Sequence, residues 1–321
     1  MKVLLLGGTR FTGRALAQAL SGAGHDVTVA SRRAAEVELE GVEGVAGERD
    51  ELLVKLAGRQ FDETIDFIAY EPEGIFAATR SVRTQRYTLI SSTWLPRYLG
   101  LDHAAEIAEP EGASLPDGLP SITYRYLRGK LLAETAVHEA RAAGQDATVV
   151  RLPVMTGPGD HTRRLHFYRS RLCDSDGLLV VGDGAHEVQI ASHLDLARAL
   201  GRWVELHDRP KAPVWEATPP AELTWRRFLE TLAENDGVSA SLHLVSEDRL
   251  RGALPELLEA DPLWRERPIA LSENNLFRMT GTAVTPVARW MEGLEPVDRR
   301  AMEPSLRARE RDLIRRLAHV D

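Results

Sequence analysis

A tyrosine and a lysine four residues apart point to acid–base chemistry in the middle of this chain. Tyr126 and Lys130 stand at positions i and i+4 of a segment whose pattern predicts a helix, so their side chains share one face. A lysine ammonium beside a phenol favours the phenolate, because opposite charges attract. An unperturbed tyrosine has a pKa of about 10, which is too high for an efficient base near neutral pH. The pair therefore predicts a tyrosine that exchanges a proton with a substrate.

A glycine-rich turn lies near the N-terminus, after the first apolar run. It consists of Gly7, Gly8, Thr9, Arg10, Phe11, Thr12 and Gly13. Gly7 permits a tight turn, Gly13 permits close packing of the next helix on a sheet, and the helix N-terminus can receive a pyrophosphate. Arg10 replaces the middle glycine of Gly-x-x-Gly-x-x-Gly and can place its guanidinium beside an adenosine. Taken alone, the turn also fits an ordinary strand-to-helix connection; followed by Tyr126 and Lys130, it indicates redox chemistry on a nicotinamide cofactor.

The residues after the second apolar run bear on the choice of cofactor. Ser31, Arg32 and Arg33 stand where a carboxylate is expected if the cofactor's 2′-hydroxyl is bound. With Arg10, the two arginines suit a 2′-phosphate instead. Charge-assisted hydrogen bonds contribute about 1.5–3 kcal/mol each, so two of them favour NADPH over NADH by a factor on the order of a hundred. The alternative is a solvated basic turn. Glu48 is a candidate acceptor for the adenine amine.

Apolar runs alternate with amphipathic stretches through the first half of the chain. We expect strands at residues 3–6, 27–30, 64–69, 87–90 and 147–152, and helices at 11–20, 51–56 and 126–143. This alternation predicts an α/β fold with a Rossmann-type doubly wound parallel sheet. After residue 157 the pattern loosens, with a helix expected at 192–206, another at 224–233 and a strand at 242–245.

These elements predict two parts. Residues 1–155, with a return segment at about 185–215, form the dinucleotide-binding domain. Residues 156–184 and 216–321 form a smaller C-terminal substrate-binding lobe.

Composition narrows the class of partner. The 321 residues are 43% hydrophobic and carry a net charge of −8, which gives no general attraction to nucleic acid or to an anionic membrane. We expect a small-molecule substrate. The single cysteine, Cys173, and an N-terminal apolar run too short for a signal segment favour the cytoplasm. His161 and His166 lack the spacing of a zinc motif, so no metal is predicted.

The ordered motifs resemble one known family. The glycine turn, residues 89–93, the Tyr-x-x-x-Lys at 126–130, residues 151–158 and the segment from 182 to 197 together resemble an extended short-chain dehydrogenase/reductase of the NAD-dependent epimerase/dehydratase superfamily. The resemblance runs from Lys2 to roughly Leu206. It implies an NAD(P)-dependent oxidoreductase and, because related helices often pair, a possible homodimer.

The resemblance also implies residue roles. Tyr126 would exchange a proton with the substrate oxygen, and Lys130 would bind the nicotinamide ribose and lower the pKa of Tyr126. Thr93 would hydrogen-bond the same oxygen as charge develops on it, with Ser91 or Ser92 in that role if the register shifts. The alternative for Thr93 is an ordinary strand-end threonine. The residues implied to contact the cofactor also include Ser91 and Pro153.

Tyr124 is the rival phenol. Its i+4 partner is Arg128, which cannot lose its proton and does not fit the family pattern. We therefore favour Tyr126.

Departures from the family pattern bear on the substrate. Val154 stands where an asparagine commonly contacts a substrate diphosphate, so a nucleotide sugar is disfavoured. Trp94, directly after Thr93, suggests an aromatic wall beside the reacting centre, or a core residue. Further candidates to line the substrate pocket are Arg164, Tyr168 and Arg171, although their spacing also suits a solvated helix face.

Three functions remain open. The first is an NADPH-dependent reductase that adds hydride to a carbonyl or imine of a small metabolite, with Tyr126 as proton donor. The second is an NAD(P)-dependent sugar epimerase or dehydratase that retains its cofactor. The third is a non-catalytic NAD(P)-sensing or RNA-binding relative, because the glycine turn also resembles that of chloroplast stem-loop-binding proteins. Arg32, Arg33 and Val154 favour the first, with NAD less expected than NADP.

Overall fold

The chain forms two compact units. The structure is a computed structural model that describes residues 1–36, 38–100, 115–116, 119–263, 271–298 and 300–318. Unit 1 consists of Met1–Pro153, His193–Pro219 and Ala270–Val284, and unit 2 of Val154–Ser192, Pro220–Ile269 and Thr285–Asp321. Each unit therefore draws on more than one stretch of sequence.

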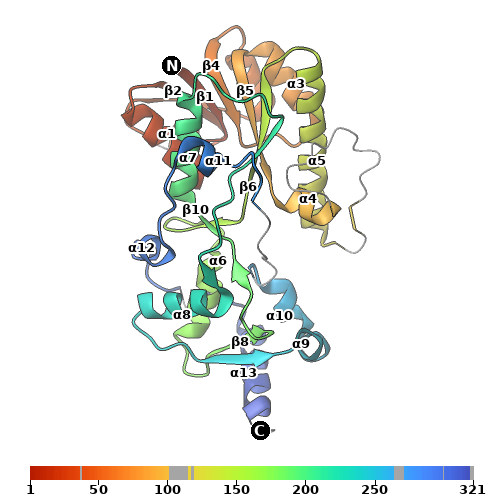
Figure 1. Ribbon diagram of the computed structural model, residues 1–321, viewed down its shortest axis with the longest axis vertical. Coiled ribbons are helices and arrows are strands. Elements are labelled where there is room, and N and C mark those ends of the chain that lie inside the picture. Colours follow the sequence, from red (N-terminus) through yellow and green to blue (C-terminus); the bar gives the residue numbers. More distant parts are fainter. Residues whose placement is uncertain (37, 101–114, 117–118, 264–270, 299, 319–321) are drawn as a thin grey trace. The chain divides into compact units, whose positions relative to one another are not determined.

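A parallel sheet forms the centre of unit 1 (Figure 1). Among the described residues it has seven strands in the order β11-β6-β5-β4-β1-β2-β3. The strands are β1 (Lys2–Leu6), β2 (Asp26–Ser31), β3 (Val42–Ala46), β4 (Gln60–Asp66), β5 (Arg83–Ser92), β6 (Ala147–Leu152) and β11 (Val214–Glu216). The chain runs outward from β1 to β3 and then crosses back to β4, so the strand order reverses between β1 and β4. In such sheets ligands bind at this switch point, outside the carboxyl ends of the strands.

Helices cover both faces of this sheet (Figure 1). The helix α1 (Phe11–Gly22) packs against α7 (His193–Glu205), and the short helix α11 (Leu276–Thr280) lies on α7. On the other face lie α2 (Arg49–Lys55), α3 (Pro72–Ser81) and α5 (Ser121–Ala142), and α4 (Trp94–Leu99) contacts α5. Because both faces are covered, the side chains of Val3, Leu4, Leu5 and Leu6 are fully buried, as the unbroken apolar run of β1 requires. The short 3-10 turn η1 (Ala34–Glu36) follows β2.

A buried ion pair ties α5 to the sheet. Arg151, at the end of β6, donates from Nε to Glu134 Oε1 (3.0 Å) and from a terminal nitrogen to Glu134 Oε2 (2.6 Å). Ser91 in β5 donates to the same carboxylate at 2.5 Å. Both charged side chains are almost fully buried, with exposed fractions of 0% and 2%. The pair therefore fixes α5 against two adjacent strands.

Unit 2 is built from short elements. The strands β8 (Leu178–Val181) and β13 (Leu242–Val245) pair in parallel, β7 (Met155–Thr156) pairs with β10 (Ala191–Ser192), and β9 (Glu187–Val188) pairs antiparallel with β12 (Leu223–Thr224). The helices are α6 (Arg164–Leu172), α8 (Trp225–Asn235), α9 (Glu247–Ala253), α10 (Pro255–Ala260), α12 (Val287–Met291) and α13 (Pro304–Ala318). In its core the rings of Trp225 and Phe228 stack, and the Tyr168 ring meets the Trp225 ring edge to face.

The predicted α/β fold with a Rossmann-type parallel sheet is confirmed, with local differences. The strand expected at 64–69 runs from Gln60 to Asp66, because the Asp66 carboxylate accepts a hydrogen bond from the backbone N–H of Ile68 (3.0 Å) and turns the chain. Unit 1 takes residues 193–219 and the segment up to Val284, whereas the sequence placed the return segment at about 185–215 and residues 216–321 in the substrate lobe. Backbone bonding explains this placement, since Glu216 N donates to Asn274 O at 3.0 Å.

Replacing Arg151 by Met should destabilise the protein strongly. The substitution leaves the Glu134 carboxylate buried without its bidentate partner, which typically costs about 3–5 kcal/mol. Urea unfolding of wild type and variant measures the difference. Arg128→Met is the matched control, because Arg128 is an exposed arginine on α5, the helix that carries Glu134. This variant should change stability by less than about 0.5 kcal/mol. A loss as small as that of the control would show that the pair does not hold α5.

Candidate functional site

The predicted catalytic and cofactor residues of unit 1 gather where several strands end. Gly7 follows β1, Asp66 ends β4, and Thr93 follows β5. Because β1, β4 and β5 are adjacent and parallel, these three positions share one edge of the sheet. This edge includes the switch point, where a ligand is expected.

The glycine turn is compact because neighbouring atoms leave no room for a side chain at its glycines. Gly7 has a φ of +94°, and a Cβ added to it would lie 2.5 Å from the Ile68 side chain. A Cβ on Gly13 would lie 2.8 Å from the Cα of Gly8, so the start of α1 packs directly on the turn. Thr9 N donates to Gly7 O at 3.0 Å and closes the turn. The ring of Phe11, in the first turn of α1, stacks on that of His193 at 4.0 Å between centroids.

The N-terminus of α1 suits an anion. Arg10 is its N-cap residue, with no side-chain cap hydrogen bond, and no acidic residue occupies the first turn. Such an end presents backbone N–H groups and the positive end of the helix dipole. A pyrophosphate group therefore fits the turn formed by residues 7–13, with Thr12 in the first turn of α1.

The basic residues after β2 lie on the surface. Ser31 is buried and its hydroxyl donates to Thr9 Oγ1 at 3.2 Å, which joins the end of β2 to the glycine turn. Arg33 pairs with Glu36 at 2.6 Å, and Arg32 lies 4.0 Å from Glu48. All four of these charged side chains are at least half exposed. Surface pairs of this kind contribute little and exchange readily for a stronger anion.

Tyr126 and Lys130 lie on one face of α5, as their spacing predicts. Lys130 is buried, and its ammonium donates to Ile90 O at 2.8 Å and to Ala69 O at 3.4 Å. It also lies 4.4 Å from the centre of the Tyr70 ring, within the range of a cation–π contact. The rings of Tyr70 and Tyr126 are tilted, with centroids 6.0 Å apart. Two phenols and one ammonium therefore form a single cluster.

Burial perturbs the pKa values of this cluster. It lowers the pKa of Lys130 to about 8, although the carboxylates of Asp66 and Glu134 oppose the shift. Near neutral pH most Lys130 side chains therefore remain charged, but they lose the proton within reach of mild base. Burial raises the pKa of Tyr70 to about 12, and the charges of Tyr126 and Asp66 act in the same direction. Tyr70 thus stays a neutral phenol that can donate a hydrogen bond.

The sequence did not single out Tyr70 or the acidic group behind it. Asp66 is fully buried and accepts two hydrogen bonds from Arg49, at 3.1 and 2.6 Å. The Tyr87 hydroxyl donates to the same carboxylate at 2.7 Å. Burial acts to lower the pKa of Arg49, but the attraction of Asp66 outweighs it and the pKa is raised. Asp66 therefore balances positive charge behind Lys130.

Gly129 makes the close approach of Tyr70 possible. A Cβ at this position would lie 3.0 Å from the Tyr70 side chain. No pattern in the sequence links residue 70 to residue 129; the available signal was an aromatic residue directly after the apolar residues 67–69 that follow β4.

The hydroxyl residues after β5 differ in their surroundings. Thr93 is buried, stands as the N-cap residue of α4 and donates its backbone N–H to Leu152 O at 3.0 Å. Ser91 is engaged with Glu134, and Ser92 Oγ accepts from Trp94 N at 3.2 Å. Trp94 and Tyr126 both pack on the apolar cluster of Leu95, Leu115, Leu127 and Leu131. Trp94 therefore contributes to an aromatic wall on the same cluster as Tyr126.

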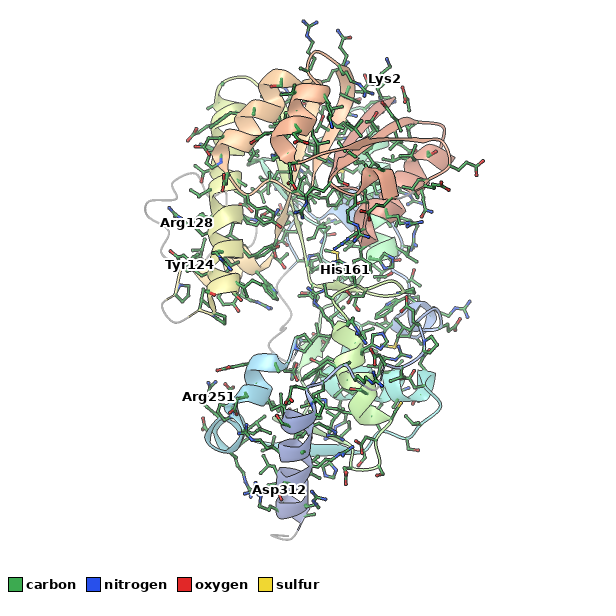
Figure 2. All side chains as sticks on the ribbon, turned by 180° about the vertical axis from the view of Figure 1, so that it is seen from behind. Lys2, Tyr124, Arg128, His161, Arg251 and Asp312 are labelled. Carbon is green, nitrogen blue, oxygen red and sulfur yellow. The ribbon has the colours of Figure 1, made fainter. Side chains whose placement is uncertain are left out.

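Tyr124, the rival phenol, lies elsewhere on the helix. Its ring is 46% exposed, and Arg128 is exposed as well. Figure 2 shows both side chains on the outer side of α5, away from the sheet. Their position supports Tyr126 as the candidate proton donor.

The substrate candidates of unit 2 are mostly internal. Tyr168 is fully buried, its hydroxyl is hydrogen-bonded to Asp261, and it accepts from Leu263 N at 2.9 Å. Arg171 is 1% exposed, pairs with Glu310 at 2.9 Å and lies over the Phe167 ring. Both side chains hold unit 2 together, so we do not carry them into the proposed site. Arg164 is partly exposed, and it donates to Thr162 Oγ1 at 2.6 Å.

The boundary between the two units falls directly after β6. Pro153 closes the first segment of unit 1 and Val154 begins unit 2. Val154 is buried, and its carbonyl accepts from Ala191 N at 3.0 Å.

The described residues also bear on metal binding and on membrane insertion. Across the described part of the chain, no group of three or more histidine, cysteine, aspartate or glutamate side chains is arranged to hold a metal ion. No helix within the same residues combines the length and the apolar character that a membrane span requires.

Comparisons with known proteins agree with this geometry. Residues 3–91 match the model of the NAD dependent epimerase/dehydratase family. The family resemblance expected from the sequence is confirmed. The matched residues contain the glycine turn, Asp66, Tyr70 and Ser91, and they end before Thr93, Tyr126 and Lys130. No curated protein matches the sequence.

Solved structures resemble this chain in fold over most or all of its length. UDP-glucuronic acid 4-epimerase from Bacillus cereus, in complex with NAD, is 14% identical, with a TM-score of 0.65; the alignment covers 100% of this chain and 98% of that one. The reductase domain of the aureusimine biosynthetic cluster is 18% identical, with a TM-score of 0.62 and coverage of 91% and 88%. An NAD-dependent NDP-hexosamine 5,6-dehydratase of tunicamycin biosynthesis is 16% identical, with a TM-score of 0.61 and coverage of 91% and 95%. These likenesses show the fold.

Lys130 should titrate near pH 8 in the folded protein. The chain has only four lysines, Lys2, Lys55, Lys130 and Lys211, so NMR of protein labelled with ¹³C at lysine Cε can resolve each one. One signal should titrate near pH 8 and be absent from Lys130→Met. An unfolded lysine has a pKa of about 10.4, so the unfolded state binds more protons and this group makes the protein more stable as pH rises from about 8 to about 10. Four signals that all titrate above pH 10 would contradict the burial of Lys130.

Proposed function

We propose that the protein is an NADPH-dependent reductase that acts on a carbonyl or imine of a small metabolite. The observation that carries the proposal is the cluster of Tyr126, Lys130 and Tyr70 at the carboxyl edge of the sheet. A phenol beside a largely charged ammonium, next to a glycine turn that suits a pyrophosphate, is what proton transfer coupled to a dinucleotide cofactor requires.

The residues of unit 1 fit such a cofactor. The turn from Gly7 to Gly13 and the start of α1 would hold the pyrophosphate, and Lys130 would hold the nicotinamide ribose. When bound, NADPH supplies the hydride. The chain's own part is to orient the reactants, to exclude water and to move one proton.

Each side chain of the cluster then has a task. Tyr126 gives its hydroxyl proton to the substrate oxygen or nitrogen as negative charge develops there. The Lys130 ammonium stabilises the phenolate that remains, because opposite charges attract over a short distance in a buried site. Thr93 hydrogen-bonds the same substrate atom. Tyr70 keeps its proton and holds Lys130 in place through its ring.

Arg10, Arg32 and Arg33 support the choice of NADPH. The two arginines after β2 have weak, exposed carboxylate partners in Glu48 and Glu36. A dianionic 2′-phosphate can displace such partners, since hydrogen bonds between oppositely charged groups are stronger than neutral ones. Ser31 joins this segment to the glycine turn, so both ends of the adenosine would be bound from adjacent elements.

The second candidate is an epimerase or dehydratase that retains its cofactor. The likeness to the Bacillus cereus epimerase, whose structure contains NAD, favours it. The same Tyr126, Lys130 and Thr93 would serve a transient oxidation. A small-molecule substrate is common to both candidates; we keep a cytoplasmic location and a homodimer as expectations from the sequence.

Replacing Tyr126 by Phe should abolish turnover but not cofactor binding. The variant keeps the ring that packs against Tyr70 and loses only the proton donor, so kcat should fall by about 10²–10⁴-fold. A carbonyl and imine substrate screen with NADPH identifies the reaction, and kcat and cofactor Kd are then compared between wild type and variant. Tyr124→Phe is the matched control and should keep wild-type kcat. Unchanged turnover in Tyr126→Phe would overturn the mechanism.

Cofactor exchange and preference separate the two candidates. The purified protein is denatured, any released nucleotide is identified, and the cofactor-free protein is titrated with NADPH and NADH. We expect exchangeable binding with a preference for NADPH on the order of a hundredfold, which Arg32→Ser/Arg33→Ser should largely remove. Tightly retained NAD, or equal affinities in the wild type, would instead favour the epimerase or dehydratase.

A further inference from the structure

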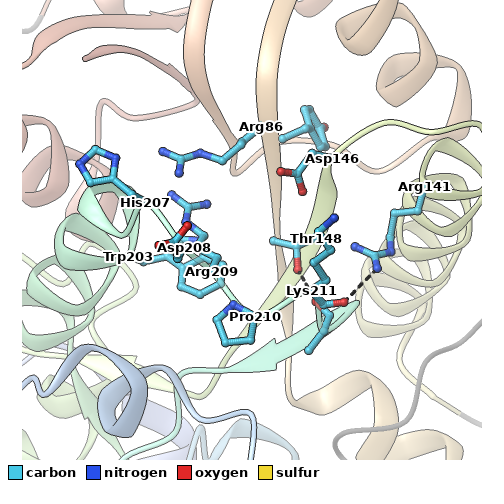
Figure 3. A pocket seen from close by; sticks show the side chains of 12 residues that line it. Arg86, Arg141, Asp146, Thr148, Trp203, His207, Asp208, Arg209, Pro210 and Lys211 are labelled. Carbon is cyan, nitrogen blue, oxygen red and sulfur yellow. Dashed lines mark hydrogen bonds between the residues drawn. The ribbon is translucent and has the colours of Figure 1, made fainter.

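A cavity lies at the edge of the unit 1 sheet opposite to the candidate active site. It has a volume of about 180 Å³ and is lined by the amino ends of β5 and β6 and by the segment that joins α7 to β11 (Figure 3). The strands are parallel, so this edge is at the far end of β5 and β6 from Thr93 and Pro153. The cavity therefore belongs to no part of the proposed active site.

Two guanidinium groups beside this cavity share one buried carboxylate. Glu63, in β4, is fully buried and lies 2.9 Å from Arg86 Nε and 2.8 Å from a terminal nitrogen of Arg209. The other two nitrogens of Arg86 donate to Leu206 O and Val204 O, both at 2.9 Å, at the end of α7. Arg86 is thus fully engaged. One negative charge faces two positive charges at this point.

Arg209 is the incompletely partnered member of this group. Its side chain is only 9% exposed and lies over the Trp203 ring, with 4.4 Å from Cζ to the centroid. One terminal nitrogen donates to Glu63 Oε1 at 3.2 Å. Within the described residues its Nε has no hydrogen-bond partner. Leaving a buried charged donor unpaired is costly, so this nitrogen calls for an acceptor from outside the protein. Burial also lowers the pKa of Arg209, which an anion would reverse.

The remaining lining residues leave the site positive. Arg141 and Lys211 add two cations, and Asp146 and Asp208 add two carboxylates. With Glu63 included, four permanent cations face three carboxylates. Arg141 donates to Ala147 O at 2.6 Å and to Lys211 O at 3.2 Å, the latter visible in Figure 3. It therefore fixes the backbone that presents Lys211 at the rim.

We propose that this cavity is a second binding site, for a phosphate group. A tetrahedral oxyanion accepts hydrogen bonds in several directions, so it can accept from Arg209 Nε and from the Lys211 ammonium together. A cavity of about 180 Å³ admits inorganic phosphate or a small phosphate monoester. Occupation of the site would fasten the end of α7 and the start of β11 to β5 and β6.

Protection of Lys211 from acylation tests the site in the wild-type protein. The full-length protein is treated with an amine-acylating reagent in inorganic phosphate, in glycerol phosphate or in chloride of equal ionic strength, and each lysine is quantified by peptide mass spectrometry. Either phosphate compound should slow modification of Lys211 by the factor 1 + [phosphate]/Kd, about threefold at twice Kd. Lys55, exposed on α2, is the internal control and should react equally in all three salts. Equal rates at Lys211 in all three salts, or equal protection of Lys55, would overturn the proposal.

Variants give an independent measurement. Phosphate should raise the Tm of the wild type, and Lys211→Glu should remove most of this shift because it brings a negative charge to the rim. Lys55→Glu has the same change of charge at another exposed lysine and should keep the shift. Both positions are exposed, so both variants should fold. The same phosphate-induced shift in Lys211→Glu as in the wild type would count against the site.

Discussion

The buried ion pair of Glu134 and Arg151 is the constraint on which the candidate active site depends. Two charges removed from water are tolerated only when their geometry is good, and here both oxygens of Glu134 are used by Arg151 while Ser91 binds one of them as well. Only one rotation of α5 meets this requirement. Lys130 stands one turn before Glu134 and Tyr126 two turns before it, so the same setting directs the ammonium and the phenol to the carboxyl edge of the sheet.

Lys130 shows how the fold tunes a reactive group. Its ammonium is held by two backbone carbonyls, one in β5 and one just after β4, and by the face of the Tyr70 ring. Burial weakens its hold on the proton, whereas Asp66 and Glu134 strengthen it. The Lys130 ammonium is therefore charged at neutral pH, but its pKa of about 8 lies close enough to neutral for the proton to be lost in mild base. Arg49 and Tyr87 donate hydrogen bonds to the buried Asp66 carboxylate and so keep its negative charge near Lys130.

Local sequence patterns predicted the features of the fold and the site that depend on short-range spacing. The apolar run of β1, the glycine turn and the i, i+4 spacing of Tyr126 and Lys130 each determine structure over a few neighbours, and these were placed correctly. The partners of Asp66 and Glu134 were not found, because these pairs join residues that are distant in sequence and leave no periodic trace. The short strand β11 escaped for a related reason: Val214–Glu216 is recognisable only through its pairing with β6. Tyr168 and Arg171 had the spacing of an exposed helix face, yet ion pairs and hydrogen bonds within unit 2 bury them.

The discontinuity of unit 1 has a consequence for synthesis on the ribosome. Its last strand and the helix α11 come from residues 214–216 and 276–280, after the first segment of unit 2 has been made. Until these residues emerge, β6 is an edge strand whose free backbone groups can pair with another chain. Domains tend to fold as their residues emerge, and exposed strand edges favour aggregation. The nascent chain therefore exposes this strand edge throughout the interval between the synthesis of β6 and that of β11.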